Sequence, residues 1–192
     1  VPGDRFLDGI GQDAGHTGAV QDHQVNLLPV FVVLPLLRLG VAHFGDELCY
    51  RVTGQVSFES CWPATKLLWL KENVPEIFAA ARHVLLLEDY IIYLLTGRFV
   101  AEGSLLTSTE YWDIRTKKYW KEMLDFIGVD ESTLPEIRES GEIVGTILPD
   151  MAEELGISPN AKITTGCLDQ VAGAIGVGNI RPGIFSENIG AA

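Results

Sequence analysis

The sequence Lys162-Ile-Thr-Thr-Gly-Cys-Leu-Asp-Gln-Val-Ala-Gly-Ala-Ile-Gly-Val-Gly178 carries more information than any other part of this chain. Apolar and β-branched residues before Gly166 predict a short strand, and Gly166 predicts a tight turn. The residues after the turn predict a helix that opens near Asp169 and packs closely against a neighbour, because apolar side chains alternate with small glycines. Asp169 is therefore expected at the start of a helix, just beyond the end of a strand.

An acidic side chain at a helix start lies near free backbone N–H groups and the positive end of the helix dipole. These groups keep Asp169 ionised and fix its direction. If its oxygens face a cleft, Asp169 is a carboxylate that can accept a proton from a substrate hydroxyl. The alternative is that Asp169 serves only as the N-cap, which is the commoner role for Asp at a helix start. Gly173, Gly176 and Gly178 lie within and after the helix, so they do not form a dinucleotide-binding loop.

The composition excludes some classes of partner. The 192 residues are 47% apolar and 21% charged, as in an ordinary soluble globular chain. The formal net charge of -12 argues against a nucleic acid partner, because phosphate binding needs a basic surface. Cys49, Cys61 and Cys167 are widely spaced and contain no C-x-x-C pair, so no structural metal site or disulfide framework is expected. This cysteine usage is typical of a reducing cytoplasm.

Residues 1–43 differ in composition from everything that follows. They contain no Lys, Glu, Ser, Trp or Tyr, and all five types are frequent from Phe44 onward. The apolar run 25–41 is short and broken by prolines and an arginine, whereas a membrane helix needs about 20 apolar residues. The basic start of a signal peptide is also absent. The change favours a segment foreign to the rest, through a shifted reading frame, a bad junction or disorder, and we expect proteolysis to remove it early.

From Phe44 onward, helical and strand-like patterns alternate, which predicts an α/β or α+β domain. The predicted helices span 61–73, 75–81, 88–95, 116–127 and 151–155. The predicted strands lie at 84–87, 143–147, 162–165 and 184–186, and residues 104–113 are expected to form a loop with short elements of structure. Pro63 suits the first turn of its helix.

Four motifs follow one another in a specific order. The helix at 61–73 contains Pro63, Lys66, Leu67, Trp69, Leu70, Glu72 and Asn73 at a recurrent spacing. Leu95-Thr-Gly97 follows Asp89-Tyr90, Gly166-Cys-Leu-Asp-Gln170 follows the central strand, and Ser186-Glu-Asn-Ile-Gly-Ala191 lies near the last residue of the sequence. Together these motifs resemble the FGGY family of carbohydrate kinases over residues 44–192, and look most like the members that phosphorylate xylulose. Cys61 departs from the family pattern, and Ala191 stands where the family has Thr.

The resemblance implies a ribonuclease H-like, actin-like ATPase fold, with two such domains around a cleft. It implies that Asp169 is the general base, which takes the proton of a sugar hydroxyl as that oxygen attacks the γ-phosphorus of ATP. Gln170 would contact sugar hydroxyls, Cys61 and Trp62 would lie near the sugar, and Gly190 and Ala191 would approach the ATP phosphates. The implied cofactors are ATP and Mg²⁺, the implied partner is a small sugar rather than a nucleic acid or a membrane, and a homodimer is compatible with the family.

The resemblance covers about the second half of the family's N-terminal domain. Residues 1–43 show no counterpart of the family's phosphate-binding hairpin, and no adenine-binding domain is present, so residues 1–192 alone are expected to be inactive. One alternative is a scaffold domain that keeps the actin-like fold and binds a partner without catalysis. Another is a hydrolase that uses Asp169 with a metal, but this stretch lacks the further carboxylates of a two-metal site.

Overall fold

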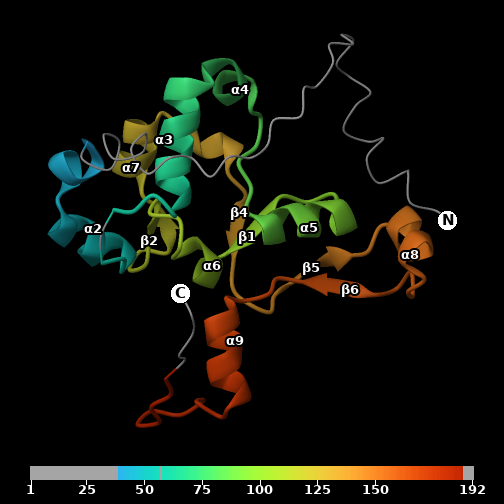
Figure 1. Ribbon diagram of the computed structural model, residues 1–192. Coiled ribbons are helices and arrows are strands. Elements are labelled where there is room, and N and C mark those ends of the chain that lie inside the picture. Colours follow the sequence, from blue (N-terminus) through green and yellow to red (C-terminus); the bar gives the residue numbers. More distant parts are fainter. Residues whose placement is uncertain (1–38, 57, 188–192) are drawn as a thin grey trace.

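The computed structural model describes residues 39–56 and 58–187 (Figure 1). The predictions for residues 1–38, and those for Gly190 and Ala191, lie outside the described residues. Residues 39–44 are helical, so the predicted boundary between residues 43 and 44 falls within a helix. Among the described helices, none has both the length and the apolar character needed to cross a membrane.

The main core lies between helices α3 (Pro63–Asn73) and α7 (Lys121–Ile127), with α2 (Asp46–Thr53) and α4 (Pro75–Ala80) around them (Figure 1). Pro63 occupies the first helical position of α3, where its missing N–H costs no hydrogen bond. The buried side chains of this core are Cys49, Phe58, Ala64, Leu67, Leu68, Ala101, Leu106, Tyr111, Trp112, Tyr119, Trp120, Met123, Leu124, Ile127, Val129 and Leu134.

The described strands form three two-stranded sheets. Strands β1 (Val100–Glu102) and β4 (Glu136–Arg138) pair in parallel, whereas β2 (Trp112–Asp113) with β3 (Lys118–Tyr119) and β5 (Ile143–Thr146) with β6 (Lys162–Thr164) are antiparallel. Helix α5 (Leu87–Thr96) contacts β1, β5 and β6. The remaining helices are α6 (Gly103–Leu106), a 3₁₀ turn at Glu131–Thr133, α8 (Pro149–Leu155) and α9 (Asp169–Gly176). The chain is thus the predicted mixture of helices and strands, and α9 projects from the rest of it (Figure 1).

The prediction of a strand at 84–87 is wrong. These residues lead into α5, and Leu86, although extended, is the residue before the first turn of that helix. The backbone N–H of Leu86 donates to Asp89 Oδ2 at 2.8 Å, so the carboxylate fixes the start of α5 at this point. The apolar run is therefore the entry to a helix rather than a sheet strand.

The predicted helix 116–127 starts too early, and the predicted strand 184–186 is absent. The Asp113 carboxylate accepts hydrogen bonds from the backbone of Arg115 and Thr116 and so forms a turn. Strand β3 follows this turn, and α7 begins only at Lys121. Residues 184–186 have no regular structure. The predicted helices at 61–73, 75–81, 88–95 and 151–155 and the strand at 143–147 are confirmed to within a few residues.

Candidate functional site

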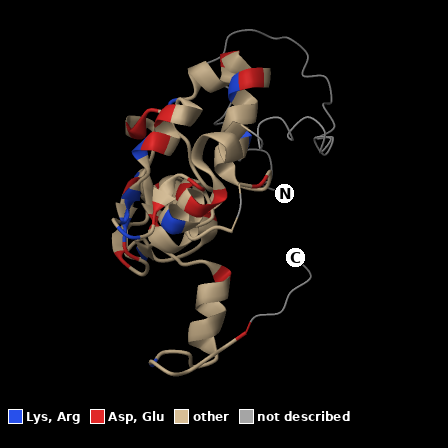
Figure 2. Cartoon of the chain, turned by 90° about the vertical axis from the view of Figure 1, so that its left-hand side faces the viewer, with Lys and Arg blue, Asp and Glu red and all other residues tan. Residues whose placement is uncertain are grey.

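Asp169 is the first residue of α9, directly after the turn that follows β6. The residue at the N-cap position is Leu168, which makes no capping hydrogen bond with its side chain. Asp169 Oδ1 accepts a hydrogen bond from the backbone N–H of Gln170 at 2.9 Å, and its side chain is exposed. The interpretation of Asp169 as a helix N-cap is therefore wrong. Figure 2 shows that α9 carries its acidic residue at its start and is otherwise uncharged.

The turn between β6 and α9 is held by hydrogen bonds to three other segments. The buried hydroxyl of Thr165 donates to the carbonyl of Glu139 at 2.7 Å and accepts from the backbone N–H of Glu142 at 3.0 Å. The N–H of Gly166 donates to Glu88 Oε1 at 2.9 Å, and the N–H of Leu168 donates to Ser104 Oγ at 2.9 Å. Asp169 is thus attached to a backbone whose position is fixed by α5, α6 and the β4–β5 loop.

Gly166 allows a close approach to the Glu88 carboxylate. A Cβ atom at this position would lie 3.1 Å from Glu88 Oε2 and 3.2 Å from Glu88 Oε1. That spacing is tighter than ordinary van der Waals contact, so a larger residue requires the Glu88 carboxylate to shift by a few tenths of an ångström. The sequence predicted the turn at Gly166, and the structure adds this packing reason for the glycine.

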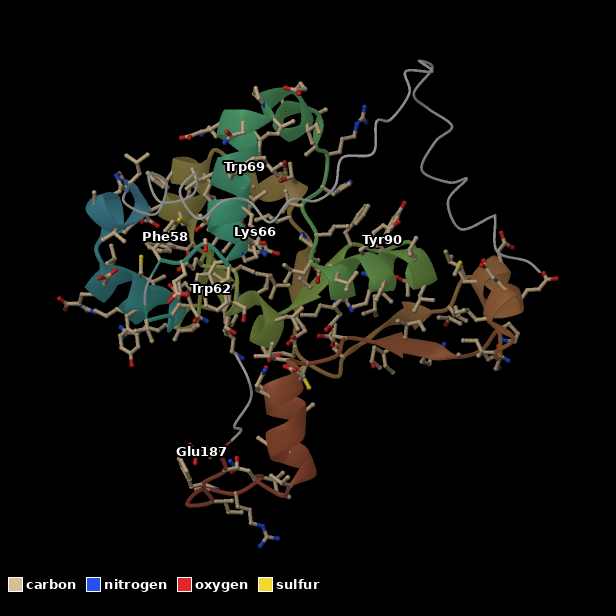
Figure 3. The ribbon with its side chains drawn as sticks, in the orientation of Figure 1. Phe58, Trp62, Lys66, Trp69, Tyr90 and Glu187 are labelled. Carbon is tan, nitrogen blue, oxygen red and sulfur yellow. The ribbon has the colours of Figure 1, made fainter. Side chains whose placement is uncertain are left out.

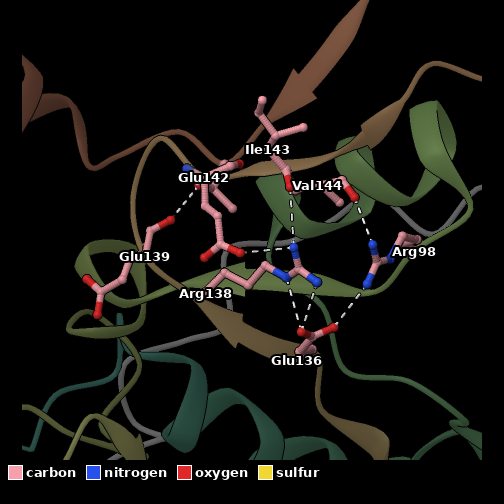
Figure 4. A network of polar contacts seen from close by, with 8 residues as sticks. Arg98, Glu136, Arg138, Glu139, Glu142, Ile143 and Val144 are labelled. Carbon is pink, nitrogen blue, oxygen red and sulfur yellow. Dashed lines mark hydrogen bonds and ion pairs between the residues drawn. The ribbon is translucent and has the colours of Figure 1, made fainter.

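Two ion-paired arginines support the β4–β5 loop that holds Thr165 (Figure 4). The guanidinium of Arg138, largely buried, contacts Glu136 at 3.0 Å and Glu142 at 3.1 Å. Arg98 donates to the carbonyl of Val144 at 2.8 Å and contacts Glu136 at 3.4 Å. Because these pairs are partly exposed, each contributes little stability by itself. Together they connect the residues after α5 to β4 and β5, next to the turn that precedes α9.

The start of α3 presents the other two predicted sugar-site residues. Trp62 is the residue before the first turn of α3 (Figure 3). Cys61 precedes it at an exposed position. The Cys61 thiol lies 3.8 Å from Glu59 Oε2, and burial, with a smaller contribution from that carboxylate, raises the pKa of the thiol. The indole N–H of Trp62 is buried and has no hydrogen-bond partner among the described residues.

Helix α6 and the residues after it contact both predicted parts of the site. The N–H of Ala64, in the first turn of α3, donates to the carbonyl of Thr109 at 3.1 Å. Ser104, in α6, receives the N–H of Leu168 before α9. The structure thus brings the start of α3 and the start of α9 to the same short segment, and Gln170 lies exposed next to Asp169. The assignments of sugar contacts to Gln170, Cys61 and Trp62 remain predictions.

Glu88, Glu102 and Ser104 also hold the site, and local sequence patterns did not predict them. Glu102 is 1% exposed, and its carboxylate accepts hydrogen bonds from Ser104 N, Ser104 Oγ, Leu105 N and Ser140 Oγ at 2.6–2.8 Å. One local pattern could have indicated Glu102. It is an acidic residue directly after the apolar run Phe99-Val-Ala, and a serine follows two residues later. Glu88 gives no such signal, because its partner is 78 residues away.

A second buried carboxyl group lies next to the start of α3. Glu110 is completely buried and has a positive φ of 65°. Burial raises the pKa of Glu110 to about 8, and the nearby Glu59 carboxylate adds to this rise, while the backbone N–H of Glu59 partly offsets it. Glu110 is therefore neutral over most of the physiological pH range.

The described residues contain no group of three His, Cys, Asp or Glu side chains that could hold a metal ion. Asp169 is a single exposed carboxylate at the start of α9, on a turn that hydrogen bonds hold in place. This arrangement can accept a proton from a bound hydroxyl group, which defines a class of site used by group-transfer enzymes.

Residues 43–176 match the FGGY family of carbohydrate kinases, N-terminal domain, and the chain therefore belongs to this family. It is 33% identical over 132 residues to a xylulose kinase of Haemophilus influenzae, covering 67% of this chain and 27% of that protein. It also resembles the crystal structures of a gluconate kinase and of a ligand-bound xylulose kinase from Lactobacillus acidophilus. For each, the TM-score is 0.70 and the identity 27%, covering 76% of this chain and 30% of the other.

These comparisons confirm the predicted family and the actin-like ATPase fold, of which the chain contains part. The chain spans about a quarter to a third of the length of the relatives it matches.

Proposed function

We propose that this chain provides the general base and part of the sugar-binding surface of an ATP-dependent carbohydrate kinase. The observation that carries the proposal is the position of Asp169: an exposed carboxylate at the first residue of α9, one position after the N-cap, on a turn held by three other segments. A scaffold domain would have no need for a carboxylate fixed in this way. Membership of the FGGY family supports the same conclusion.

In the proposed reaction, one sugar hydroxyl lies within hydrogen-bond distance of the Asp169 carboxylate. Asp169 accepts the hydroxyl proton while that oxygen forms a bond to the γ-phosphorus of ATP and the bond to the β,γ-bridging oxygen breaks. ADP leaves with the electron pair of that bond. Such a reaction depends mainly on positioning and on neutralising phosphate charge. ATP with its Mg²⁺ is the co-substrate, and Mg²⁺ would supply the charge neutralisation.

The remaining assignments follow the family's arrangement. Gln170, next to the base, would accept or donate hydrogen bonds to further sugar hydroxyls, and Cys61 and Trp62 would border the sugar from the start of α3. Gly190 and Ala191 would approach the ATP phosphates. A ketose such as xylulose is the proposed substrate, because xylulose kinases are prominent among the relatives and solved structures.

The proposed function is tested in a kinase of full length. Residues 44–187 would replace the matching segment of the Haemophilus influenzae xylulose kinase, which gives a chimeric kinase. A coupled assay of ADP release would compare xylulose, ribulose and gluconate, with the unmodified chain assayed beside it. We expect turnover highest with xylulose, and none from residues 1–192 alone. Higher turnover with gluconate would change the proposed sugar. A chimeric kinase that binds ATP but phosphorylates no sugar would favour the scaffold alternative.

A further inference from the structure

The helix that carries Asp169 receives little support from apolar packing. Helix α9 buries none of its residues, and Val171 and Ile175 are 39% and 54% exposed. The position of its first turn therefore depends on the polar contacts of the preceding residues. Of these contacts, the one nearest to Asp169 joins the N–H of Leu168 to Ser104 Oγ at 2.9 Å.

Ser104 itself is held in one orientation by Glu102. The Ser104 hydroxyl donates to Glu102 Oε1 at 2.7 Å, and the backbone N–H of Ser104 donates to Glu102 Oε2 at 2.8 Å. Leu105 N and Ser140 Oγ occupy the remaining acceptor positions of the carboxylate at 2.7 and 2.6 Å. A backbone N–H can only donate, so the Ser104 oxygen accepts the N–H of Leu168 with a lone pair. The hydroxyl proton of Ser104 points to Glu102 Oε1, and one orientation of the hydroxyl satisfies both contacts.

We propose that Ser104, oriented by the buried Glu102, is a positioning residue for the base Asp169. Fixing the N–H of Leu168 fixes the peptide plane that precedes Asp169, and with it the direction in which the first turn of α9 presents the carboxylate. The claim that Ser104 affects catalysis rests on the proposed kinase function. The claim that Ser104 holds the residue before α9 rests only on its contact with Leu168.

The structural part is tested by amide hydrogen exchange, measured by NMR on the full chain. Leu168 is expected to exchange slowly in the unmodified protein. Ser104→Ala is expected to raise its exchange rate about tenfold, the effect of losing one hydrogen bond, and Ser104→Thr should restore the slow rate because it keeps the hydroxyl. Ser140→Ala is the matched control: it removes another hydrogen bond to the same Glu102 carboxylate but leaves the contact to Leu168.

Fast exchange of Leu168 in the unmodified chain would overturn the proposal without any variant. Equal acceleration by Ser104→Ala and Ser140→Ala would also overturn it, because the effect would then be a general loosening around Glu102. In the chimeric kinase, Ser104→Ala is expected to lower kcat by roughly 10- to 100-fold with the KM for ATP unchanged, as for a misplaced catalytic group. If the unmodified chimeric kinase shows no turnover, the proposed function fails, and the exchange measurements still decide the positioning role.

Discussion

The α3–α7 core and the β6–α9 segment are built in different ways. Helix α7 buries Met123, Leu124 and Ile127, each at most 2% exposed, whereas α9 buries no residue. The core is held by non-directional apolar contact, which depends on area and shape. The turn before α9 is held by directional hydrogen bonds to Glu88, Ser104 and the β4–β5 loop. Changes in the core should therefore alter stability, while changes at the turn should alter the geometry of the site with little loss of stability.

The largest expected effect on stability comes from opening a cavity in the core. Met123→Ala removes a side chain that is fully buried, and we expect a loss of about 2–5 kcal/mol in the free energy of unfolding. Val171→Ala in the exposed part of α9 is the control, with an expected change within about 0.5 kcal/mol. Urea unfolding of the chain measures both. Similar losses for the two variants would show that α9 is packed as tightly as the core.

The next effect concerns pH, because two buried carboxyl groups have raised pKa values. Burial raises the pKa of Glu110 to about 8 and that of Asp89 to about 7. Each group holds its proton more tightly in the folded chain than in the unfolded chain. Stability should therefore fall as pH rises from about 4.5, near the unfolded pKa, to about 8.

Glu110→Gln tests the origin of this fall in stability. The amide does not titrate, so the variant should lose less stability than the parent between pH 5 and pH 8, and it should be the more stable of the two at pH 8. Urea midpoints at several pH values within this window give the comparison. An unchanged slope in the variant would mean that the titration of Glu110 makes no contribution. Asp113 and Asp130 have lowered pKa values, so their contributions are lost only at lower pH.

The smallest effect on stability is expected at the turn. In Gly166→Ala the new methyl group would meet the Glu88 carboxylate at 3.1 Å, and the Glu88 side chain would have to shift by a few tenths of an ångström, which weakens its hydrogen bond to the N–H of residue 166. We expect a stability loss of only about 1 kcal/mol, the value of one hydrogen bond, together with faster amide exchange at position 166. Gly173→Ala is the control, since a Cβ there meets no atom within 4 Å and should stabilise the helix. Slow exchange in Gly166→Ala would contradict this expectation and show that Glu88 shifts without releasing the N–H of residue 166.

The same contrast explains which features could be predicted from the sequence. Helix α3 was predicted correctly, because Pro63 and the apolar residues after it are local signals. Asp169 was also placed correctly at a helix start, because Gly166 marks the turn. The N-cap interpretation failed because the N-cap position falls one residue earlier, at Leu168, a shift that local patterns do not resolve.

Features that depend on distant partners could not be predicted. Strands β1 and β4 are three residues long, too short for a recognisable period, and they pair with each other from distant parts of the sequence. Ser104 is 64 residues from Leu168, and its role follows only from the tertiary fold. The apolar run at 84–87 was assigned to a strand because short apolar runs do not distinguish a strand from the entry to a helix.

Asp169→Asn in the chimeric kinase tests the central claim most directly. Asparagine keeps the size and one oxygen of the side chain but cannot accept the sugar proton as a carboxylate does. We predict that kcat falls by roughly 10²–10⁴, that ATP affinity is little changed, and that the free energy of unfolding changes by less than about 1 kcal/mol, since only an interaction with the helix dipole is lost. Full turnover by folded Asp169→Asn protein would contradict the account and place the base elsewhere.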